Sequence, residues 1–365
     1  MHRRPRALTM TRSLAVAGRR GIIARYFAHL PVSEKTPIVT LDEGDTPLLY
    51  SEVLSRETNC HVWLKLEGLN PTGSFKDRGM TVAISKAKEE GASVVICAST
   101  GNTSASAAAY AARAGMTCAV LVPKGNVAAG KLAQTMVHGA RVLEIDDGFD
   151  AALELTKQIA ASRAVTLVNS VNPHRIEGQK TAAFEIVQAL NGPPDAHVMP
   201  VGNAGNITAL WRGYKESRDG GWTTSLPRMF GVQASGADPI VRGRQVKRPQ
   251  TIATAIQIGK PASWSGATQA ATESGGAIVS VGDDEILDAY LHLAREGIFA
   301  EPASAAGVAG LGHLVERGDV PTGATVACVL TGHGLKDPDR AISSVERPVS
   351  VRARVEDILE RLDLA

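Results

Sequence analysis

The sequence has few aromatic residues and almost no excess charge. Aromatic residues make up only 4% of the chain, and 39 basic side chains nearly balance 37 acidic ones, for a formal net charge of +2. So few aromatics do not suggest a stacking platform for single-stranded nucleic acid. So small a net charge gives no electrostatic attraction to DNA or to an anionic membrane. No apolar run approaches transmembrane length. We therefore expect no nucleic-acid partner and no membrane partner.

Cysteine is also scarce. The four cysteines are Cys60, Cys97, Cys118 and Cys328, and no two of them form a C-x-x-C pair. Three lie in apolar, strand-like runs, which predicts small buried hydrophobic side chains rather than disulfides or metal ligands. No pair of histidines has zinc spacing on a helix, so we expect no metal. This cysteine usage suits the cytoplasm.

The first 27 residues are rich in arginine and contain no acid. The apolar piece "SLAVAG" is short and is followed by "RRG" rather than by a cleavage site of small residues. We interpret this segment as a basic start of the chain, with translation beginning at Met10, and not as a signal or transit peptide.

Short apolar runs alternate with longer helical patterns along most of the chain. Residues 61–68 are typical of a strand, 76–91 of a helix and 93–100 of the next strand, and the pattern continues to a strand at 325–332. One helix is expected over 175–190. Such alternation predicts an α/β fold with mostly parallel sheets covered on both faces. Composition marks no domain boundary.

Ligands of such folds bind where strands end and helices begin. One such junction, "NPTGSFKDRG", places Lys76 at the start of a helix after a run of turn-forming residues. A second, "PVGNAGNITA", sets two glycines among small polar residues just before a helix. Free backbone N–H groups and the helix N-terminus together favour an anion there, most often phosphate. The alternative is an ordinary tight turn.

Two further junctions carry polar side chains. "ASTGNTSAS" offers more hydroxyl and amide groups than one helix cap requires. "VLTGHGLKD" ends the last strong strand with Thr331 and His333. A lysine amine can form a Schiff base with pyridoxal phosphate (PLP), which also needs a phosphate cup and a partner for its ring nitrogen. The four loops could supply all three, with Thr331 or His333 as the ring partner.

Five motifs of the sequence together resemble those of a known enzyme family. They are "NPTGSFKDRG", "STGNTSAS", "NSVNPHRIEGQK", "PVGNAGNI" and "TGHGLKDP". They resemble the motifs of the threonine synthase family, PLP enzymes of the tryptophan synthase β-like fold, also called fold type II. The resemblance runs from about residue 38 to 340. It implies two three-layer αβα domains with twisted, mostly parallel sheets and PLP in the cleft between them. The smaller, mobile domain would span 80–168, and the larger would combine 1–79 with 169–365.

The resemblance also implies roles for the cofactor residues. Lys76 would carry PLP and shuttle protons, while Phe75 packs near the ring. Asn102 would bind the 3′-oxygen and Thr331 would face the ring nitrogen. The cofactor phosphate would lie in a cradle made by Gly202, Asn203, Ala204, Gly205 and Asn206.

The substrate implied by the resemblance is O-phospho-L-homoserine. PLP-dependent γ-elimination of phosphate and β-addition of water would give L-threonine, in the last step of threonine biosynthesis. The substrate-binding residues would be Ser99, Thr100, Gly101, Thr103, Asn169, Ser170 and Arg175. Of these, Arg175 would bind the substrate phosphate, because its planar fork donates two parallel bonds. A salt bridge to Glu177 is its alternative role. The resemblance further implies a cytoplasmic homodimer.

Several readings stay open at the level of sequence. Lys180 could be structural, His333 could tune the ring nitrogen, and Glu301 is most simply a helix cap. A threonine or serine dehydratase of the same fold is the first rival function, and a non-catalytic PLP-binding relative is the second. A nucleotide-binding oxidoreductase is not supported, because no G-x-G-x-x-G opens a strand–helix–strand unit.

Overall fold

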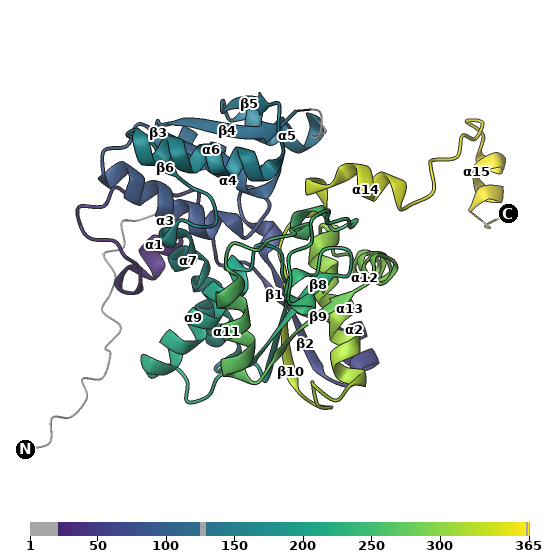
Figure 1. Ribbon diagram of the computed structural model, residues 1–365. Coiled ribbons are helices and arrows are strands. Elements are labelled where there is room, and N and C mark those ends of the chain that lie inside the picture. Colours follow the sequence, from purple (N-terminus) through teal and green to yellow (C-terminus); the bar gives the residue numbers. More distant parts are fainter. Residues whose placement is uncertain (1–20, 125–128, 363, 365) are drawn as a thin grey trace, which may run out of the picture.

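The structure is a computed structural model that describes residues 21–124, 129–362 and 364. The arginine-rich start of the chain, with Met10, lies outside these residues, so its interpretation stays a prediction. The described residues form two sheets of different size, each covered by helices on both faces (Figure 1).

The larger sheet has six strands in the order β1-β2-β10-β7-β8-β9. β1 runs antiparallel to β2, and all other neighbouring strands are parallel. The strands are β1 (Leu48–Tyr50), β2 (His61–Leu66), β7 (Ala196–Pro200), β8 (Arg228–Ala234), β9 (Ala277–Val281) and β10 (Thr325–Leu330).

Helices cover both faces of this sheet. One face packs against α2 (Glu52–Thr58), α12 (Asp283–Arg295) and α13 (Pro302–Glu316). The other packs against α8 (Thr181–Leu190), α9 (Gly205–Asp219) and α11 (Trp264–Ser274). Successive residues of a strand point to opposite faces, so Cys328 of β10 lies in the first core and Val329 in the second. The strand is therefore apolar on both sides.

The smaller sheet has four parallel strands in the order β5-β4-β3-β6. They are β3 (Val94–Ala98), β4 (Thr117–Pro123), β5 (Arg141–Ile145) and β6 (Thr166–Leu167). Helices α3 (Lys76–Glu89), α4 (Asn102–Ala114) and α5 (Ala129–Val137) cover one face, and α6 (Phe149–Ser162) covers the other. The two three-layer units confirm the predicted α/β class.

Shorter elements join these layers. They are α1 (Ile22–Arg25), η1 (Phe27–His29), η2 (Glu67–Leu69), α7 (Pro173–Gln179), α10 (Pro239–Arg242), η3 (Thr254–Ile256), η4 (Gly334–Lys336), α14 (Pro338–Ser343) and α15 (Val355–Arg361). The last two lead away from the two sheets toward the C-terminus (Figure 1). Within the described ranges, no helix combines the length and apolar character needed to cross a membrane.

Two details differ from the sequence-based expectation. The single helix predicted over 175–190 is two helices, α7 and α8, that meet at Lys180. The break lets α7 pack across α3 while α8 packs on the larger sheet. The short strands β1 and β6 were not predicted, because three and two residues carry too little alternation to stand out.

All four cysteines are buried and unpaired. Cys97 and Cys118 lie together in the core of the smaller unit, and Cys328 lies in a core of the larger one. They pack as small hydrophobic side chains, as the sequence predicted.

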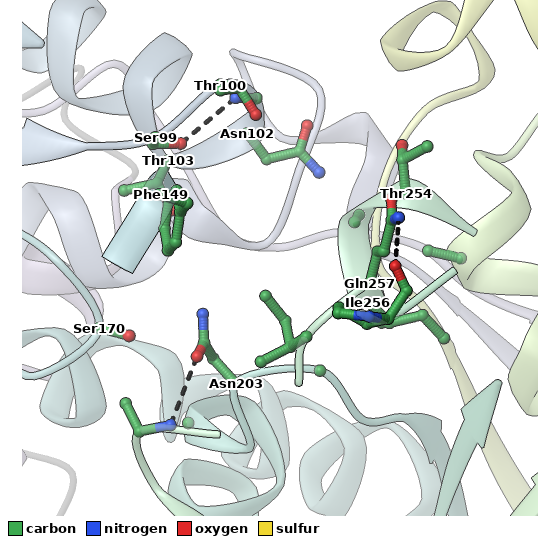
Figure 2. Close-up of a pocket in the computed structure, with 18 of the residues that line it drawn as sticks. Ser99, Thr100, Asn102, Thr103, Phe149, Ser170, Asn203, Thr254, Ile256 and Gln257 are labelled. Carbon is green, nitrogen blue, oxygen red and sulfur yellow. Dashed lines mark hydrogen bonds between the residues drawn. The ribbon is translucent and has the colours of Figure 1, made fainter. Parts of the chain in front are cut away.

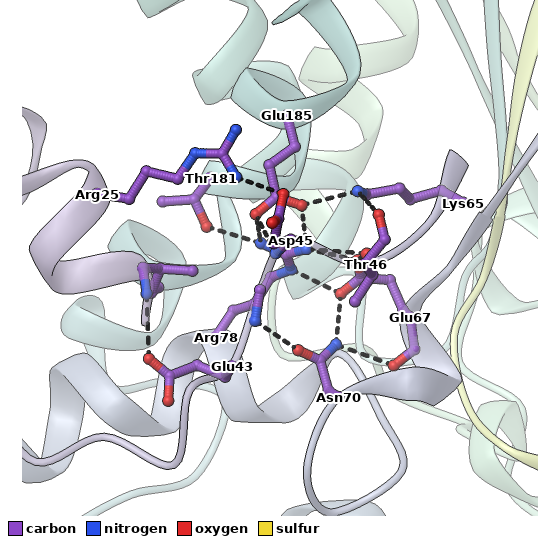
Figure 3. A network of polar contacts seen from close by, with 12 residues as sticks. Arg25, Glu43, Asp45, Thr46, Lys65, Glu67, Asn70, Arg78, Thr181 and Glu185 are labelled. Carbon is purple, nitrogen blue, oxygen red and sulfur yellow. Dashed lines mark hydrogen bonds and ion pairs between the residues drawn. The ribbon is translucent and has the colours of Figure 1, made fainter. Parts of the chain in front are cut away.

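A buried ion network holds the start of α3 in place (Figure 3). Arg78 donates from Nε to Glu67 at 2.7 Å and from Nη2 to Glu185 at 2.7 Å. Lys65 Nζ lies 2.7 Å from the same Glu185 carboxylate. Burial alone would raise the pKa of the Glu67 and Glu185 carboxyls, but the Arg78 guanidinium holds both below their usual range. Two cations and two anions thus neutralise one another next to Lys76, the first residue of α3.

Replacing Arg78 with methionine should destabilise the protein by roughly 3–5 kcal/mol, because two buried carboxylates would lose their main partner. The free energy of unfolding from urea titration measures this. Arg218→Met is the matched control, since Arg218 is partly exposed and pairs only with its neighbour Asp219. It should cost less than about 1 kcal/mol. Equal losses in the two variants would contradict the role assigned to the network.

Candidate active site

A cavity of about 1180 Å³ opens beside the carboxyl ends of β3, β7 and β10 (Figure 2). Every site residue predicted from the resemblance lines it, whereas His333, the alternative ring partner, does not. These sixteen residues are Phe75, Lys76, Ser99, Thr100, Gly101, Asn102, Thr103, Asn169, Ser170, Arg175, Gly202, Asn203, Ala204, Gly205, Asn206 and Thr331. Loops from both sheets meet here, as expected where parallel strands end.

Lys76 is the first residue of α3 and lies half-buried in the cavity wall. Its Nζ is 4.2 Å from the centre of the Phe75 ring. The pKa of the Lys76 amine is lowered to about 7, first by burial and then by the positive charge of Arg175, while Glu301 acts in the opposite direction. A large fraction of this amine is therefore neutral, and able to act as a nucleophile or base, near neutral pH.

Arg175 reaches the cavity because α7 crosses α3 at backbone distance. A Cβ atom at Gly178 would lie 1.8 Å from the Arg78 carbonyl oxygen. A Cβ atom at Gly79 would lie 2.8 Å from the Arg175 carbonyl oxygen. Only glycine fits at such a contact. The crossing thus brings an arginine of one helix beside the lysine of the other.

The Arg175 guanidinium is buried, with its donors incompletely used. Nη1 donates to the Val168 carbonyl at 3.2 Å. Nε and Nη2 have no hydrogen-bond partner among the described residues. Burial lowers the pKa of Arg175 to about 10. The alternative salt bridge is not formed, since Glu177 instead pairs with Lys180 and Arg212. A buried cation with unused donors fits an anionic ligand.

The Gly202–Asn206 loop joins β7 to α9. Ala204 has left-handed backbone angles, φ 64° and ψ −1°, which are unfavourable for a residue with a side chain. No side chain caps the N-terminus of α9. A Cβ atom at Gly202 would lie 3.0 Å from the Ile256 Cα, so the loop packs closely against η3. An uncapped helix start behind a strained loop has the features of a phosphate cradle.

The Ser99–Thr103 loop joins β3 to α4, and its side chains gather on one side of the cavity (Figure 2). The hydroxyl of Ser99 already accepts hydrogen bonds from the backbone N–H groups of Gly101, at 3.3 Å, and Ser104, at 3.2 Å. The Ser99 oxygen therefore stabilises the loop itself, and these two bonds leave the hydroxyl hydrogen of Ser99 to donate elsewhere.

Asn169 also has a structural task. Its side-chain amide accepts from the Ala98 N–H at 3.0 Å and donates to the Ala98 carbonyl at 2.8 Å. This pairing ties Asn169 to the end of β3. The predicted contact between Asn169 and the substrate stays a prediction, with one amide hydrogen left to make it.

The side chains of Lys180 and His333 contact other residues of the protein. Lys180 is buried and contacts Glu177 at 2.6 Å and Glu216 at 2.7 Å. The Nδ1 of His333 accepts from the Leu335 N–H at 3.2 Å, and its ring packs edge-on against Phe299. Both arrangements favour structural roles.

Glu301 is a site residue that the sequence analysis interpreted most simply as a helix cap, in a loop that the family resemblance places near the cofactor. It lines the cavity and accepts hydrogen bonds from Asn102 Nδ2 at 2.9 Å and Thr331 Oγ1 at 3.1 Å. It does not cap its own helix through its side chain. No local pattern signals this role, because the partners come from distant loops.

Residues 245–249 and 254–260 were also missed, although they line the cavity. Within 239–272 the sequence has five basic residues and no acid, which is a detectable signal. Among the described lining residues, six are cationic and three acidic: Lys76, Arg175, Lys247, Arg248, Lys260 and Lys336 against Asp147, Glu301 and Asp337. The cavity therefore favours anionic ligands.

Residues 39–332 match the family model described as "Pyridoxal-phosphate dependent enzyme". The chain is 56% identical over 347 residues to a threonine synthase of Mycobacterium tuberculosis, covering 94% of this chain and 96% of the relative. It is 56% identical over 328 residues to a threonine synthase of Halalkalibacterium halodurans, covering 90% and 92%. An L-serine ammonia-lyase structure from Rhizomucor miehei aligns with a TM-score of 0.72 and 23% identity, over 83% of this chain and 98% of that one.

The chain belongs to the family of pyridoxal-phosphate-dependent enzymes, with the tryptophan synthase β-like fold predicted for it. Within that family it belongs to the threonine synthases, which makes it a PLP-dependent lyase. The family and cofactor implied by the sequence motifs are thereby confirmed.

In cofactor-free protein, Lys76 should react with an amine-directed reagent with a midpoint near pH 7, because burial and Arg175 disfavour its charged form. Labelling across a pH series, followed by mass spectrometry of the Lys76 peptide, measures this midpoint. N-acetyl-lysine methylamide in the same buffers should give about 10.4. A Lys76 midpoint at that value would show that the site does not lower the pKa of this amine.

Proposed function

We propose that this protein converts O-phospho-L-homoserine and water to L-threonine and phosphate. The observation that carries the proposal is the pair formed by Lys76 and Arg175 in one cavity. The first is an amine with a pKa of about 7, and the second is a buried cation with two unused nitrogen donors. A phosphorylated amino acid needs both a nucleophilic lysine bearing PLP and a cation for its phosphate.

The residues present fit PLP. The amine of Lys76 would hold its aldehyde carbon, and the Gly202–Asn206 loop with the start of α9 would hold its phosphate. Asn102 and Thr331 would meet the ring edges, and Phe75 would pack beside the ring. When bound, the cofactor supplies an electron sink for the bonds broken at the substrate's α carbon.

Lys76 would act as the proton shuttle. Once the substrate amine has displaced it, its own amine is free to remove the Cα proton, and a pKa near 7 suits both taking and returning a proton. A Cβ proton must also leave before phosphate departs from Cγ, and Cγ must gain a proton to become the methyl group of threonine, so the Lys76 amine would carry a proton from Cβ to Cγ. Water then adds its hydroxyl at Cβ and gives its other proton to the released phosphate, and the same amine can return the Cα proton.

Arg175 would bind the substrate phosphate through Nε and Nη2, and Ser170 and Thr103 line the same cavity. The substrate carboxylate would meet the Ser99–Thr103 loop at the start of α4. Binding the two anionic ends from different loops orients the carbon chain between them. The cationic lining would attract this substrate from solution.

We further propose that residues 80–168 form a mobile domain that closes on the larger domain, 1–79 plus 169–365. Support comes from the cavity, whose walls come from loops of both sheets. We propose a homodimer, supported by the exposed Leu49, Tyr50 and Val53 at the edge of the larger sheet. Four unpaired cysteines support a cytoplasmic location.

Arg175→Gln should raise the KM for O-phospho-L-homoserine by roughly tenfold or more and change PLP affinity much less, because Arg175 would donate directly to the substrate phosphate but acts on Lys76 only through its charge. Phosphate release by the PLP-loaded enzyme measures the first effect, and fluorescence titration with PLP the second. Arg212→Gln is the control, an exposed arginine on α9 that pairs with Glu177 and Glu216.

If Arg175→Gln weakens PLP and substrate equally, Arg175 is structural. If wild-type enzyme releases no phosphate from O-phospho-L-homoserine, the proposed reaction is wrong, whatever the variant does.

A further inference from the structure

The carboxylate of Glu301 lies where elements of both sheets meet. Glu301 stands at the N-terminus of α13, and its backbone N–H donates to the Gly332 carbonyl, just after β10, at 2.9 Å. Its residue surface is 4% exposed. A Cβ atom at Gly332 would lie 2.5 Å from this carboxyl group, so glycine at 332 makes room for it. The chain thus builds space for a buried acid.

This carboxylate binds two side chains that face the cavity. Asn102 Nδ2, at the start of α4, donates to Oε2 at 2.9 Å, and Thr331 Oγ1 donates to Oε1 at 3.1 Å. An ionised carboxylate only accepts hydrogen bonds. It therefore selects the nitrogen end of the Asn102 amide and draws the single hydroxyl proton of Thr331, which leaves Ser304 as the donor in the 3.1 Å hydroxyl pair of Ser304 and Thr331.

Helix capping does not explain why the Glu301 carboxyl group is buried here. The side chain makes no hydrogen bond to the start of α13. Burial raises the pKa of the Glu301 carboxyl, although hydrogen bonds from Asn102 and Thr331 oppose the rise. The charged groups that act on it are Lys336 of η4 and Lys76 of α3. Burying a carboxyl group costs free energy, so an acid retained in this position is expected to orient the side chains that it binds.

We propose that Glu301 is the positioning residue for the cofactor ring. It holds an Asn102 amide hydrogen toward the cavity and sets the hydrogen-bond direction of Thr331. This inference rests on the proposed function, in which Asn102 and Thr331 meet the 3′-oxygen and the ring nitrogen.

The protonation of Glu301 gives the arrangement a chemical consequence. While Glu301 is ionised, the Thr331 proton points to it, and the ring nitrogen would meet an oxygen lone pair. When Glu301 is protonated, it can donate to Thr331, whose own proton would then turn to the ring nitrogen or to the Ser304 hydroxyl 3.1 Å away. Glu301 also raises the pKa of the neighbouring Lys76 amine.

Glu301→Gln tests the proposal in the full-length protein. Glutamine keeps the size but provides one acceptor and one donor in place of two acceptors. At saturating PLP, the visible circular dichroism per bound cofactor should fall by about half or more, and PLP should bind roughly tenfold more weakly. In the cofactor-free variant, the labelling midpoint of Lys76 should move to lower pH, because a negative charge has been removed.

Two further variants keep the test decisive. Glu301→Asp restores the charge with a shorter reach and should recover part of the dichroism; it also serves if Glu301→Gln does not fold. Glu296→Gln is the matched control, because Glu296 accepts a hydroxyl hydrogen bond from Ser51 at 2.6 Å and does not line the cavity. It should leave all three readings unchanged.

Unchanged dichroism and an unchanged Lys76 midpoint in folded Glu301 variants would overturn the proposal, even if their melting temperatures fall. Failure of the proposed function looks different. In that case O-phospho-L-homoserine would not turn over in wild-type enzyme, while the Glu301 variants would still alter the bound cofactor.

Discussion

The backbone crossing of α3 and α7 is the constraint on which the site depends. Gly79 and Gly178 let the two helices touch at main-chain distance, which sets Arg175 beside Lys76. Two cations brought together in a buried wall repel each other, and the pKa of Lys76 is lowered first by burial and then by that repulsion. In the proposed reaction, which needs a neutral amine and an arginine for the substrate phosphate, this cost would serve function.

Two groups of buried charges lie on or near α3. The members of one group pair with one another and are structural, whereas the other group has donors available to a ligand. Below the lysine, Arg78, Lys65, Glu67 and Glu185 satisfy one another, and the helix is fixed by them. In the cavity, two donors of Arg175 remain unused among the described residues. Buried polar groups are normally satisfied, so an unsatisfied pair of donors indicates a ligand. The neutral network supports the helix from which the reactive amine projects.

The sequence could predict much of this because its signals are local. Long apolar strands and glycine-rich junctions identified both sheets and the loops at their ends, since parallel strands deliver those loops to one edge. The break at Lys180 and the short strands β1 and β6 depend on packing that no short window records. Glu301 was read as a cap because its partners Asn102 and Thr331 lie 199 and 30 residues away. Its role exists only in the folded chain.

The most direct test of the account is the product balance of PLP-loaded enzyme given O-phospho-L-homoserine. Phosphate, threonine and 2-oxobutyrate should be measured in the same reaction. The account predicts one threonine for each phosphate, because the cavity must hold the intermediate until water adds at Cβ. Phosphate with 2-oxobutyrate in place of threonine would contradict it and show an eliminase that loses its intermediate before water adds.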